Sequence, residues 1–183
     1  LALYHMVGGT KLQDLPGLDQ LMSGMELSKN VRRAVLVGTA RGPSEIIETD
    51  DGLSIKTTWG EMAYQLGGKA GFELVKEADE RGVSPGSNVL AKLFRKNAPC
   101  LILIDEWVAY LRHIYETDGL PSGSFDANLT FVQSLTEAIK DVPGALLVAS
   151  LPASQIEVGG KGGEQALERL KNTFSRVHAS WLP

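Results

Sequence analysis

The sequence lacks several features that would mark a secreted, membrane-bound or nucleic-acid-binding protein. It has a single cysteine, Cys100, so it cannot form an internal disulfide framework, and this usage fits the reducing cytoplasm. No stretch approaches the roughly 20 apolar residues that a membrane span requires. The net charge of −4 offers no electrostatic case for binding of nucleic acid by this segment. We therefore expect a cytoplasmic location, no membrane association and no direct contact of this segment with nucleic acid.

Motifs for metal binding and for nucleophilic catalysis are also missing. His5, His113 and His178 show no metal-ligand spacing with one another or with Cys100, whose place beside an apolar run indicates a buried thiol. No Gly-x-Ser-x-Gly pattern of a serine hydrolase is present. What the chain does have is 183 residues with 43% hydrophobic content, enough for the core of one domain of ordinary size.

The most informative stretch is an apolar run that ends in two carboxylates. Residues 101–106 read Leu-Ile-Leu-Ile-Asp-Glu. The run fits a buried parallel strand, and acids at its carboxyl end would lie where ligands bind in open α/β sheets. This pattern is typical of the Walker B element of P-loop NTPases, in which Asp105 would hold Mg²⁺ through water and Glu106 would activate the attacking water. A helix that starts at the acids explains the same residues, because acids favour the first turn of a helix. The six residues alone leave both interpretations open.

Strands and helices alternate along the rest of the chain. This order predicts an α/β fold in which a parallel sheet carries helices on both faces, as in a P-loop NTPase core. Expected strands cover residues 33–39, 101–105, 145–150 and 174–178, with a glycine-rich loop at 158–163. Expected helices cover residues 1–7, 16–23, 57–66, 72–80, a segment that begins at Ser84-Pro85, 107–115, 125–140 and 164–172.

Polar residues follow two of the other expected strands. Thr39 and Ser150 end their strands, and the carboxyl ends of parallel strands lie along one edge of a sheet. Ser150 matches the position from which AAA+ ATPases sense the γ-phosphate, and Thr39 could contact Glu106 as a polar switch. The simpler alternative is that strands must end somewhere, and that Thr or Ser is ordinary there.

An arginine near the end of the chain is the remaining candidate. Arg176 follows the third strand and a helix, where AAA+ proteins place an arginine that acts across a subunit interface on a neighbour's γ-phosphate. An ordinary surface salt bridge is the alternative interpretation, and Arg169 is a weaker second choice.

The phosphate-binding motif Gly-x-x-x-x-Gly-Lys-[Ser/Thr] is missing. The glycine clusters at 8–11, 67–69 and 159–163 each lack the required order or hydroxyl, and each is better interpreted as a loop or a helix end. Residues 1–7 look like the remainder of the helix that begins at such a loop. We therefore expect residues 1–183 to be a single partial domain that starts after the P-loop and ends before the lid.

The sequence as a whole resembles a family of large prokaryotic ATP-binding proteins, long catalogued as a domain of unknown function. The similarity covers nearly the whole chain. It is carried by residues 1–5, 35–39, 58–67 (Thr-Trp-Gly-Glu-Met-Ala-Tyr-Gln-Leu-Gly), 82–87, 100–110, 124–131 and 151–160.

The resemblance implies an AAA+-type ATPase with ATP and Mg²⁺ as cofactors, which forms a homo-oligomer through the AAA+ interface. Members often lie near DNA methyltransferase or helicase genes, which implies partners in DNA modification or phage defence. This chain departs from the family pattern because it lacks Walker A and the C-terminal lid.

The sequence therefore predicts ATP binding and hydrolysis by the full-length protein, with a catalytically inactive α/β interaction module as the alternative. The expected sheet order places a P-loop strand between the Ser150 strand and the last one, so the segment alone would have a gap with two unpaired edges. We expect residues 1–183 in isolation neither to hydrolyse ATP nor to fold stably. A cooperative thermal melt of the purified segment would contradict the expectation about folding.

Overall fold

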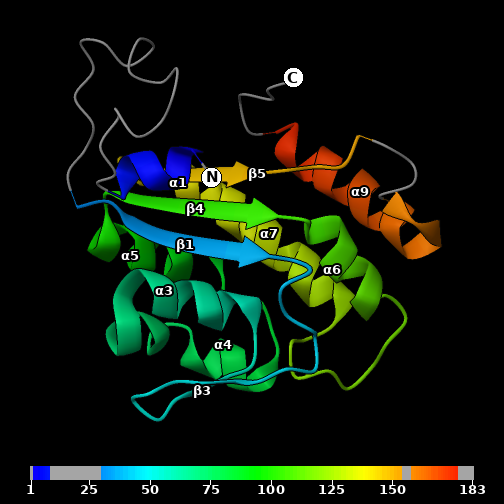
Figure 1. Ribbon diagram of the computed structural model, residues 1–183, viewed down its shortest axis with the longest axis horizontal. Coiled ribbons are helices and arrows are strands. Elements are labelled where there is room, and N and C mark those ends of the chain that lie inside the picture. The colour runs from blue at the N-terminus through cyan, green and yellow to red at the C-terminus, as the bar shows by residue number, and fades with distance from the viewer. Residues whose placement is uncertain (1, 9–29, 154–157, 177–183) are drawn as a thin grey trace.

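The computed structural model describes residues 2–8, 30–153 and 158–176 (Figure 1). Its elements in chain order are α1 (Ala2–Val7), β1 (Arg32–Val37), β2 (Ile47–Glu48), β3 (Ser54–Ile55), α3 (Thr58–Phe72), α4 (Lys76–Arg81), α5 (Ser87–Asn97), β4 (Cys100–Asp105), α6 (Trp107–Ile114), α7 (Phe125–Lys140), β5 (Ala145–Ala149) and α9 (Gly160–Phe174). Within these described ranges, no helix is long and apolar enough to cross a membrane.

The main sheet has three parallel strands in the order β1-β4-β5, and β2 and β3 form a separate short hairpin. Val37 of β1 pairs with Asp105 of β4, and Ile104 pairs with Ala149 of β5. All three strands therefore end at the same edge of the sheet (Figure 1). The predicted α/β class and parallel sheet are confirmed.

One face of this sheet carries the hydrophobic core. Alternate residues of the central strand, Cys100, Ile102 and Ile104, are at most 3% exposed and belong to one cluster with side chains of α3, α5, α6 and α7. Side chains alternate between the faces of a strand, so Arg33, which neighbours the buried Ala34, points to the other face. There it bonds the carbonyl of Tyr4 in α1 at 3.2 Å and lies over the ring of that tyrosine. Helices thus occupy both faces, as expected.

The two outer strands of the sheet, β1 and β5, differ in what lies beside them. At the β1 edge, the side-chain amide of Gln65 in α3 accepts the N–H of Val35 at 2.7 Å and donates to its carbonyl at 3.0 Å. This pair takes the place of a neighbouring strand. At the other edge, Leu146 and Val148 of β5 are 50% and 41% exposed. In the part of the chain that the structure describes, β5 pairs with β4 alone, so its other side has no strand partner there.

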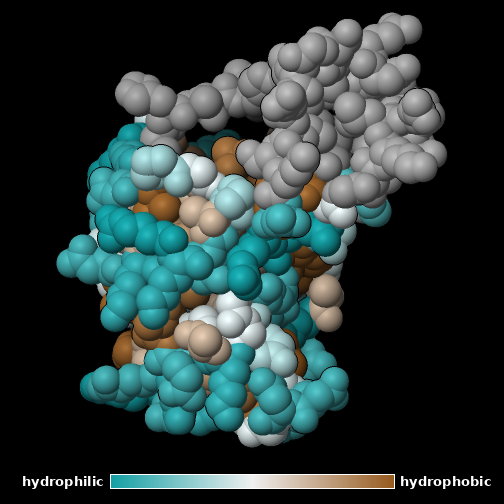
Figure 2. Space-filling model, turned by 90° about the vertical axis from the view of Figure 1, so that its left-hand side faces the viewer, coloured by the Kyte–Doolittle hydropathy of each residue, from teal (hydrophilic) through white to brown (hydrophobic). Residues whose placement is uncertain are grey.

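The end of the molecule at which the strands begin is turned to the viewer in Figure 2. Over the elements described there, the surface is mainly hydrophilic, and the visible hydrophobic residues are scattered between polar ones (Figure 2). Scattered apolar residues of this kind are normal on a protein surface. The polar residues that follow the strands lie at the opposite end, where the strands finish.

The glycine-rich segment 158–163 is the largest departure from the expected elements. The sequence predicts a loop there, but α9 begins at Gly160 and continues to Phe174. The predicted strand at 174–178 is therefore also wrong at Phe174, which is helical. A Cβ on Gly162 would lie 2.7 Å from the ring of Tyr115, and one on Gly163 would lie 1.8 Å from the carbonyl oxygen of Val158. The glycines allow close packing of the helix, and this tertiary contact overrides their low helix propensity.

Smaller differences concern helix boundaries. The expected start at Ser84-Pro85 is wrong, because α5 begins at Ser87 with Gly86 as its N-cap. Helix α3 continues past its expected end to Phe72, with a kink at Gly68. The expected helix at 16–23 and residues 177–178 of the expected last strand lie outside the described residues.

A buried carboxylate joins α4 to the start of α3. Asp79 is fully buried and accepts the backbone N–H groups of Lys56 and Thr57 at 3.2 and 2.8 Å, and the hydroxyl of Thr57 at 2.6 Å. That hydroxyl in turn accepts the N–H of Gly60 as the N-cap of α3. Asp79 therefore satisfies the buried N–H and hydroxyl of Thr57, together with the partly buried N–H of Lys56.

We predict that Asp79→Ala lowers the free energy of unfolding by about 3 kcal/mol, because it leaves buried donors of residues 56 and 57 without an acceptor. Asp118→Ala is the matched control, since Asp118 is exposed and makes no hydrogen bond among the described residues. Urea denaturation of both variants of the full-length protein, followed by tryptophan fluorescence, measures the difference. Equal stability of the two variants would contradict the role given to Asp79.

Candidate active site at the carboxyl edge of the sheet

Two adjacent carboxylates occupy the carboxyl end of the central strand. Asp105 is the last residue of β4, Glu106 follows it, and both are exposed. Glu106 adopts the left-handed conformation, with φ 54° and ψ 31°. This conformation costs a non-glycine residue about 1–2 kcal/mol, and strained residues cluster at functional sites.

Glu106 is the N-cap residue of α6, yet its side chain makes no capping hydrogen bond. The carboxylate instead accepts the hydroxyl of Thr39, at the end of the neighbouring strand β1. A helix does start at the acids, as the alternative interpretation expected, but no acid lies in its first turn, and the Glu106 side chain faces Thr39 instead of capping the helix. The contact between Thr39 and Glu106 was expected from their positions at neighbouring strand ends.

The turn that carries Thr39 lies very close to the start of α6. The N–H of Gly38 donates to the carbonyl of Asp105 at 2.8 Å, which continues the ladder between β1 and β4 by one bond. A Cβ on Gly38 would lie only 2.1 Å from the carbonyl oxygen of Glu106. Only glycine fits at this position, so Gly38 brings Thr39 to Glu106.

Ser150 completes the arrangement from the other side of β4. Its hydroxyl donates to Oδ1 of Asp105, and its backbone N–H donates to the carbonyl of Ile104 at 3.0 Å. The N–H of Glu106 approaches both Oδ1 of Asp105, at 3.0 Å, and Oγ of Ser150, at 3.4 Å. The ends of three parallel strands thus bring Thr39, Asp105, Glu106 and Ser150 into one hydrogen-bonded network, which we call the acid cluster.

The two candidate arginines lie outside the acid cluster. The backbone carbonyl of Arg176 accepts a hydrogen bond from Lys140 at the last residue of α7, at 3.0 Å. Its exposed side chain makes no ion pair with another described residue. Arg169 pairs with Asp126 at 3.1 Å, and both side chains are more than half exposed, so this contact is an ordinary surface ion pair.

The side chains of the acid cluster offer only oxygen atoms as ligands for a metal ion. Among the residues that the structure describes, no group of three or more His, Cys, Asp or Glu side chains converges as a metal site would require. Magnesium in nucleotide-binding proteins commonly uses one or two carboxylates, together with water and substrate phosphates. Asp105, with a neighbouring hydroxyl, fits that limited role and does not fit an all-protein metal cage.

Arg41 is a residue of this region whose role the sequence did not reveal. Its guanidinium donates to the carbonyls of Glu45 and Lys56 at 2.6 and 2.7 Å and to Glu61 at 3.1 Å. These bonds fasten the turn that carries Thr39 to the β2–β3 hairpin and to α3. The partners of Arg41 lie up to 20 residues away in the sequence, so no local pattern predicts these bonds. Locally, the sequence indicates only a Gly-Pro turn at residues 42–43.

The other reactive side chains behave as the sequence predicts. Cys100 is buried in the first position of β4, and desolvation raises the pKa of its thiol to about 11, so the thiol is protonated at neutral pH. His5 in α1 and His113 in α6 are exposed helix residues, whereas His178 lies outside the described residues.

We predict that Gly38→Ala destabilises the fold by about 2 kcal/mol, because the new methyl group meets the backbone of Glu106. Gly42→Ala is a matched control in the same turn, where a Cβ would lie 3.7 Å from its nearest neighbour, an ordinary contact. Urea denaturation compares the two variants. If Gly38→Ala were as stable as Gly42→Ala, the close approach of the turn to Glu106 would be refuted.

Comparison with known proteins finds a family of unknown function, as the resemblance of the sequence implies. Comparison with curated proteins and with solved structures gives no significant match. The family model of the DUF499 N-terminal domain matches residues 13–180, which is most of the chain. The chain therefore belongs to the DUF499 N-terminal domain family.

Proposed function

We propose that the chain supplies the acid-bearing part of a Mg²⁺-dependent ATPase of the AAA+ P-loop class. The observation that carries this proposal is the acid cluster at the carboxyl ends of three parallel strands. Ligands bind at this edge in open α/β sheets. Adjacent carboxylates there suit metal-assisted hydrolysis of a phosphoanhydride bond, in which one acid helps to hold the metal ion and the other positions or deprotonates the attacking water.

Asp105 is the proposed magnesium residue. The Ser150 hydroxyl and the N–H of Glu106 both donate to Oδ1 of Asp105, which fixes the orientation of the carboxylate. Its other oxygen, Oδ2, accepts no hydrogen bond from the described residues and could accept one from metal-bound water. Bound Mg²⁺ would neutralise charge on the phosphates of ATP. Ser150 lies beside Asp105 and is the proposed γ-phosphate contact.

Glu106 is the proposed base. Its exposed carboxylate can accept a proton from water, and the Thr39 hydroxyl holds it in one orientation. Because Glu106 accepts the hydrogen bond from Thr39 on one carboxylate oxygen, its other oxygen remains for water. Loss of the hydrogen bond from Thr39 would then free the Glu106 carboxylate, which is the polar switch expected from the sequence. Arg176 lies outside this network, so its proposed role is on the γ-phosphate of a neighbouring subunit.

The asymmetry of the sheet edges supports the same proposal. Gln65 closes the β1 edge, whereas β5 has no second strand partner among the described residues and could pair with another strand. A parallel strand that pairs with β5 would carry its following loop to the side of Ser150 and Asp105. A phosphate-binding loop has to lie at that place to hold ATP over the acid cluster.

An α/β interaction module without catalysis is the second candidate, and one observation favours it. The described glycine clusters do not form a phosphate-binding loop, because Gly67 and Gly68 lie within α3 and Gly160, Gly162 and Gly163 lie within α9. In that case the acid cluster would only stabilise the strand ends. The homo-oligomer and the partners in DNA modification or phage defence are further proposals that rest on the family resemblance.

We predict that Glu106→Gln in the full-length protein lowers the rate of ATP hydrolysis by at least about 100-fold, because the amide cannot accept a proton. Binding of ATP, measured by titration with a fluorescent ATP analogue, should be retained. Glu80→Gln is the control, since Glu80 is exposed on α4 and lies outside the acid cluster. Full turnover in Glu106→Gln would reject the base, and no ATP binding by the parent protein would favour the interaction module.

A further inference from the structure

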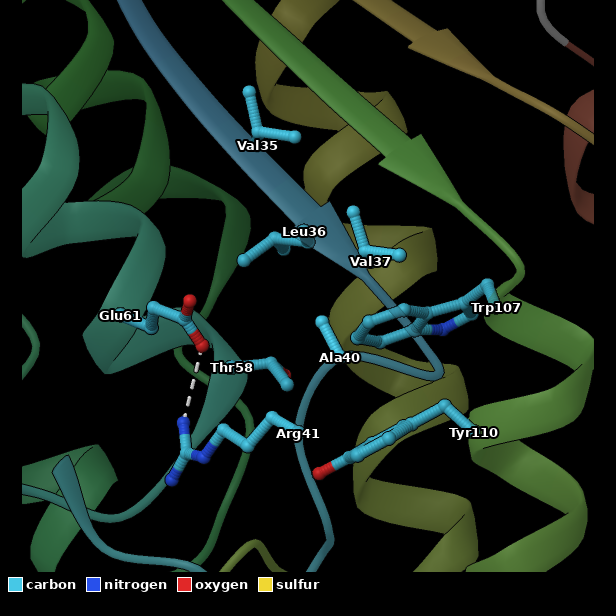
Figure 3. Close-up of a pocket in the computed structure, with 9 residues that line it drawn as sticks. All are labelled: Val35, Leu36, Val37, Ala40, Arg41, Thr58, Glu61, Trp107 and Tyr110. Carbon is cyan, nitrogen blue, oxygen red and sulfur yellow. Dashed lines mark hydrogen bonds and ion pairs between the residues drawn. The ribbon is translucent and has the colours of Figure 1, made fainter.

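The side chain of Arg41 is largely enclosed by the protein, since it is only 10% exposed. Figure 3 shows it running from the turn after β1 toward Glu61 of α3, which it contacts at 3.1 Å. Its second terminal nitrogen lies within hydrogen-bond distance of three backbone carbonyls, those of Glu45, Ile55 and Lys56, at 2.6, 3.2 and 2.7 Å. A planar guanidinium can bond several acceptors at once, whereas the ammonium of a lysine is a compact point charge. Arg41 therefore fixes the turn against both the β2–β3 hairpin and α3.

The segment to which Arg41 bonds is itself held from its other side. Lys56 offers its carbonyl to Arg41, whereas its N–H donates to Asp79 at 3.2 Å. The N–H of Thr57 also donates to Asp79, at 2.8 Å, and this carboxylate is fully buried. The backbone at residues 56–57 is thus bonded to α4 through its N–H groups and to the turn through a carbonyl. The support beneath Arg41 is therefore part of the rigid core.

Glu61 connects Arg41 to the edge of β1. One of its carboxylate oxygens accepts the guanidinium of Arg41, and the other accepts the side-chain amide of Gln65 at 3.1 Å. The same amide group of Gln65 bonds the N–H and the carbonyl of Val35 in β1. A continuous hydrogen-bonded path therefore joins the outer edge of β1 to the turn that follows this strand.

Thr39 lies between two fixed points of that turn. On one side, the N–H of Gly38 donates to the carbonyl of Asp105 at 2.8 Å and bonds the turn to β4. On the other side, Arg41 bonds the turn to α3. Successive Cα atoms are a fixed distance of about 3.8 Å apart, so a shift of Arg41 has to be taken up at Thr39. The hydroxyl of Thr39 in turn donates to Glu106.

We propose that Arg41 is a positioning residue of the proposed ATPase, which acts through the turn to keep the Thr39 hydroxyl on the Glu106 carboxylate. The hydrogen bonds of Arg41 all go to residues outside the acid cluster, so Arg41 is not a catalytic residue. Because this role concerns turnover, it rests on the proposed function. An arginine that only stabilised the fold would have an effect on turnover that does not depend on Thr39.

A double-mutant cycle in the full-length protein separates the two roles. Thr39→Val removes the hydroxyl at an exposed position and should lower kcat about tenfold with the KM for ATP unchanged, because the base acts in the chemical step. Arg41→Lys keeps the charge but loses the planar fork, and should lower kcat about fivefold. The double variant should be no slower than Thr39→Val alone, whereas independent effects would multiply to about 50-fold.

Arg81→Lys is the matched control, since Arg81 pairs with Glu77 at 3.3 Å on the surface of α4 and lies outside this path. It should leave kcat unchanged. Hydrogen exchange provides a readout that does not require turnover. The N–H of Ala40 bonds the carbonyl of Val37 at 3.0 Å, and it should exchange faster in Arg41→Lys than in the parent and in Arg81→Lys.

Glu61→Gln is the second variant, which replaces Arg41→Lys in the cycle if the latter does not fold. It removes the charge that pairs with Arg41 and keeps the shape of the side chain. It should lower kcat in the parent and have no further effect in Thr39→Val. Multiplicative effects in an active protein, or full turnover in both Arg41→Lys and Glu61→Gln, would overturn the role of Arg41 alone. No ATP hydrolysis by the parent would reject the proposed function together with this role.

Discussion

The site depends on the pairing of β4 with a parallel strand on each side. Residues 100–104 are apolar because the central strand is covered by core side chains and flanked by β1 and β5. Asp105 and Glu106 come where the strand leaves that core. The change from apolar to acidic residues therefore marks the end of the sheet at which the strands finish. Parallel pairing brings Thr39 and Ser150 to the same end.

Hydrogen bonds within the protein hold the side chains of the acid cluster in place. Hydroxyls of two neighbouring strand ends donate to the two carboxylates, and the backbone N–H of Glu106 reinforces the position of Asp105. The left-handed conformation of Glu106 and the bare backbone of Gly38 allow this close arrangement. In the proposed reaction, groups fixed in this way would need little rearrangement.

Arg41 links this edge of the sheet to the rest of the fold. It ties the turn after β1 to the β2–β3 hairpin and to α3. The same turn carries Thr39, which contacts Glu106 two residues before Arg41. Gln65 closes the β1 edge of the sheet, whereas β5 has no second strand partner among the described residues.

The sequence by itself determined the features that depend on local pattern. Helix 125–140 and the three core strands follow from periodicity and turn residues. The contact of Thr39 with Glu106 follows from strand ends in a parallel sheet. Only the tertiary structure decided the rest. Gln65 closes an edge 30 residues away in the sequence, and the glycines of α9 are helical because they pack on Tyr115 and Val158. Contacts between distant segments leave no periodic signal, because their free energy appears only once the chain has folded.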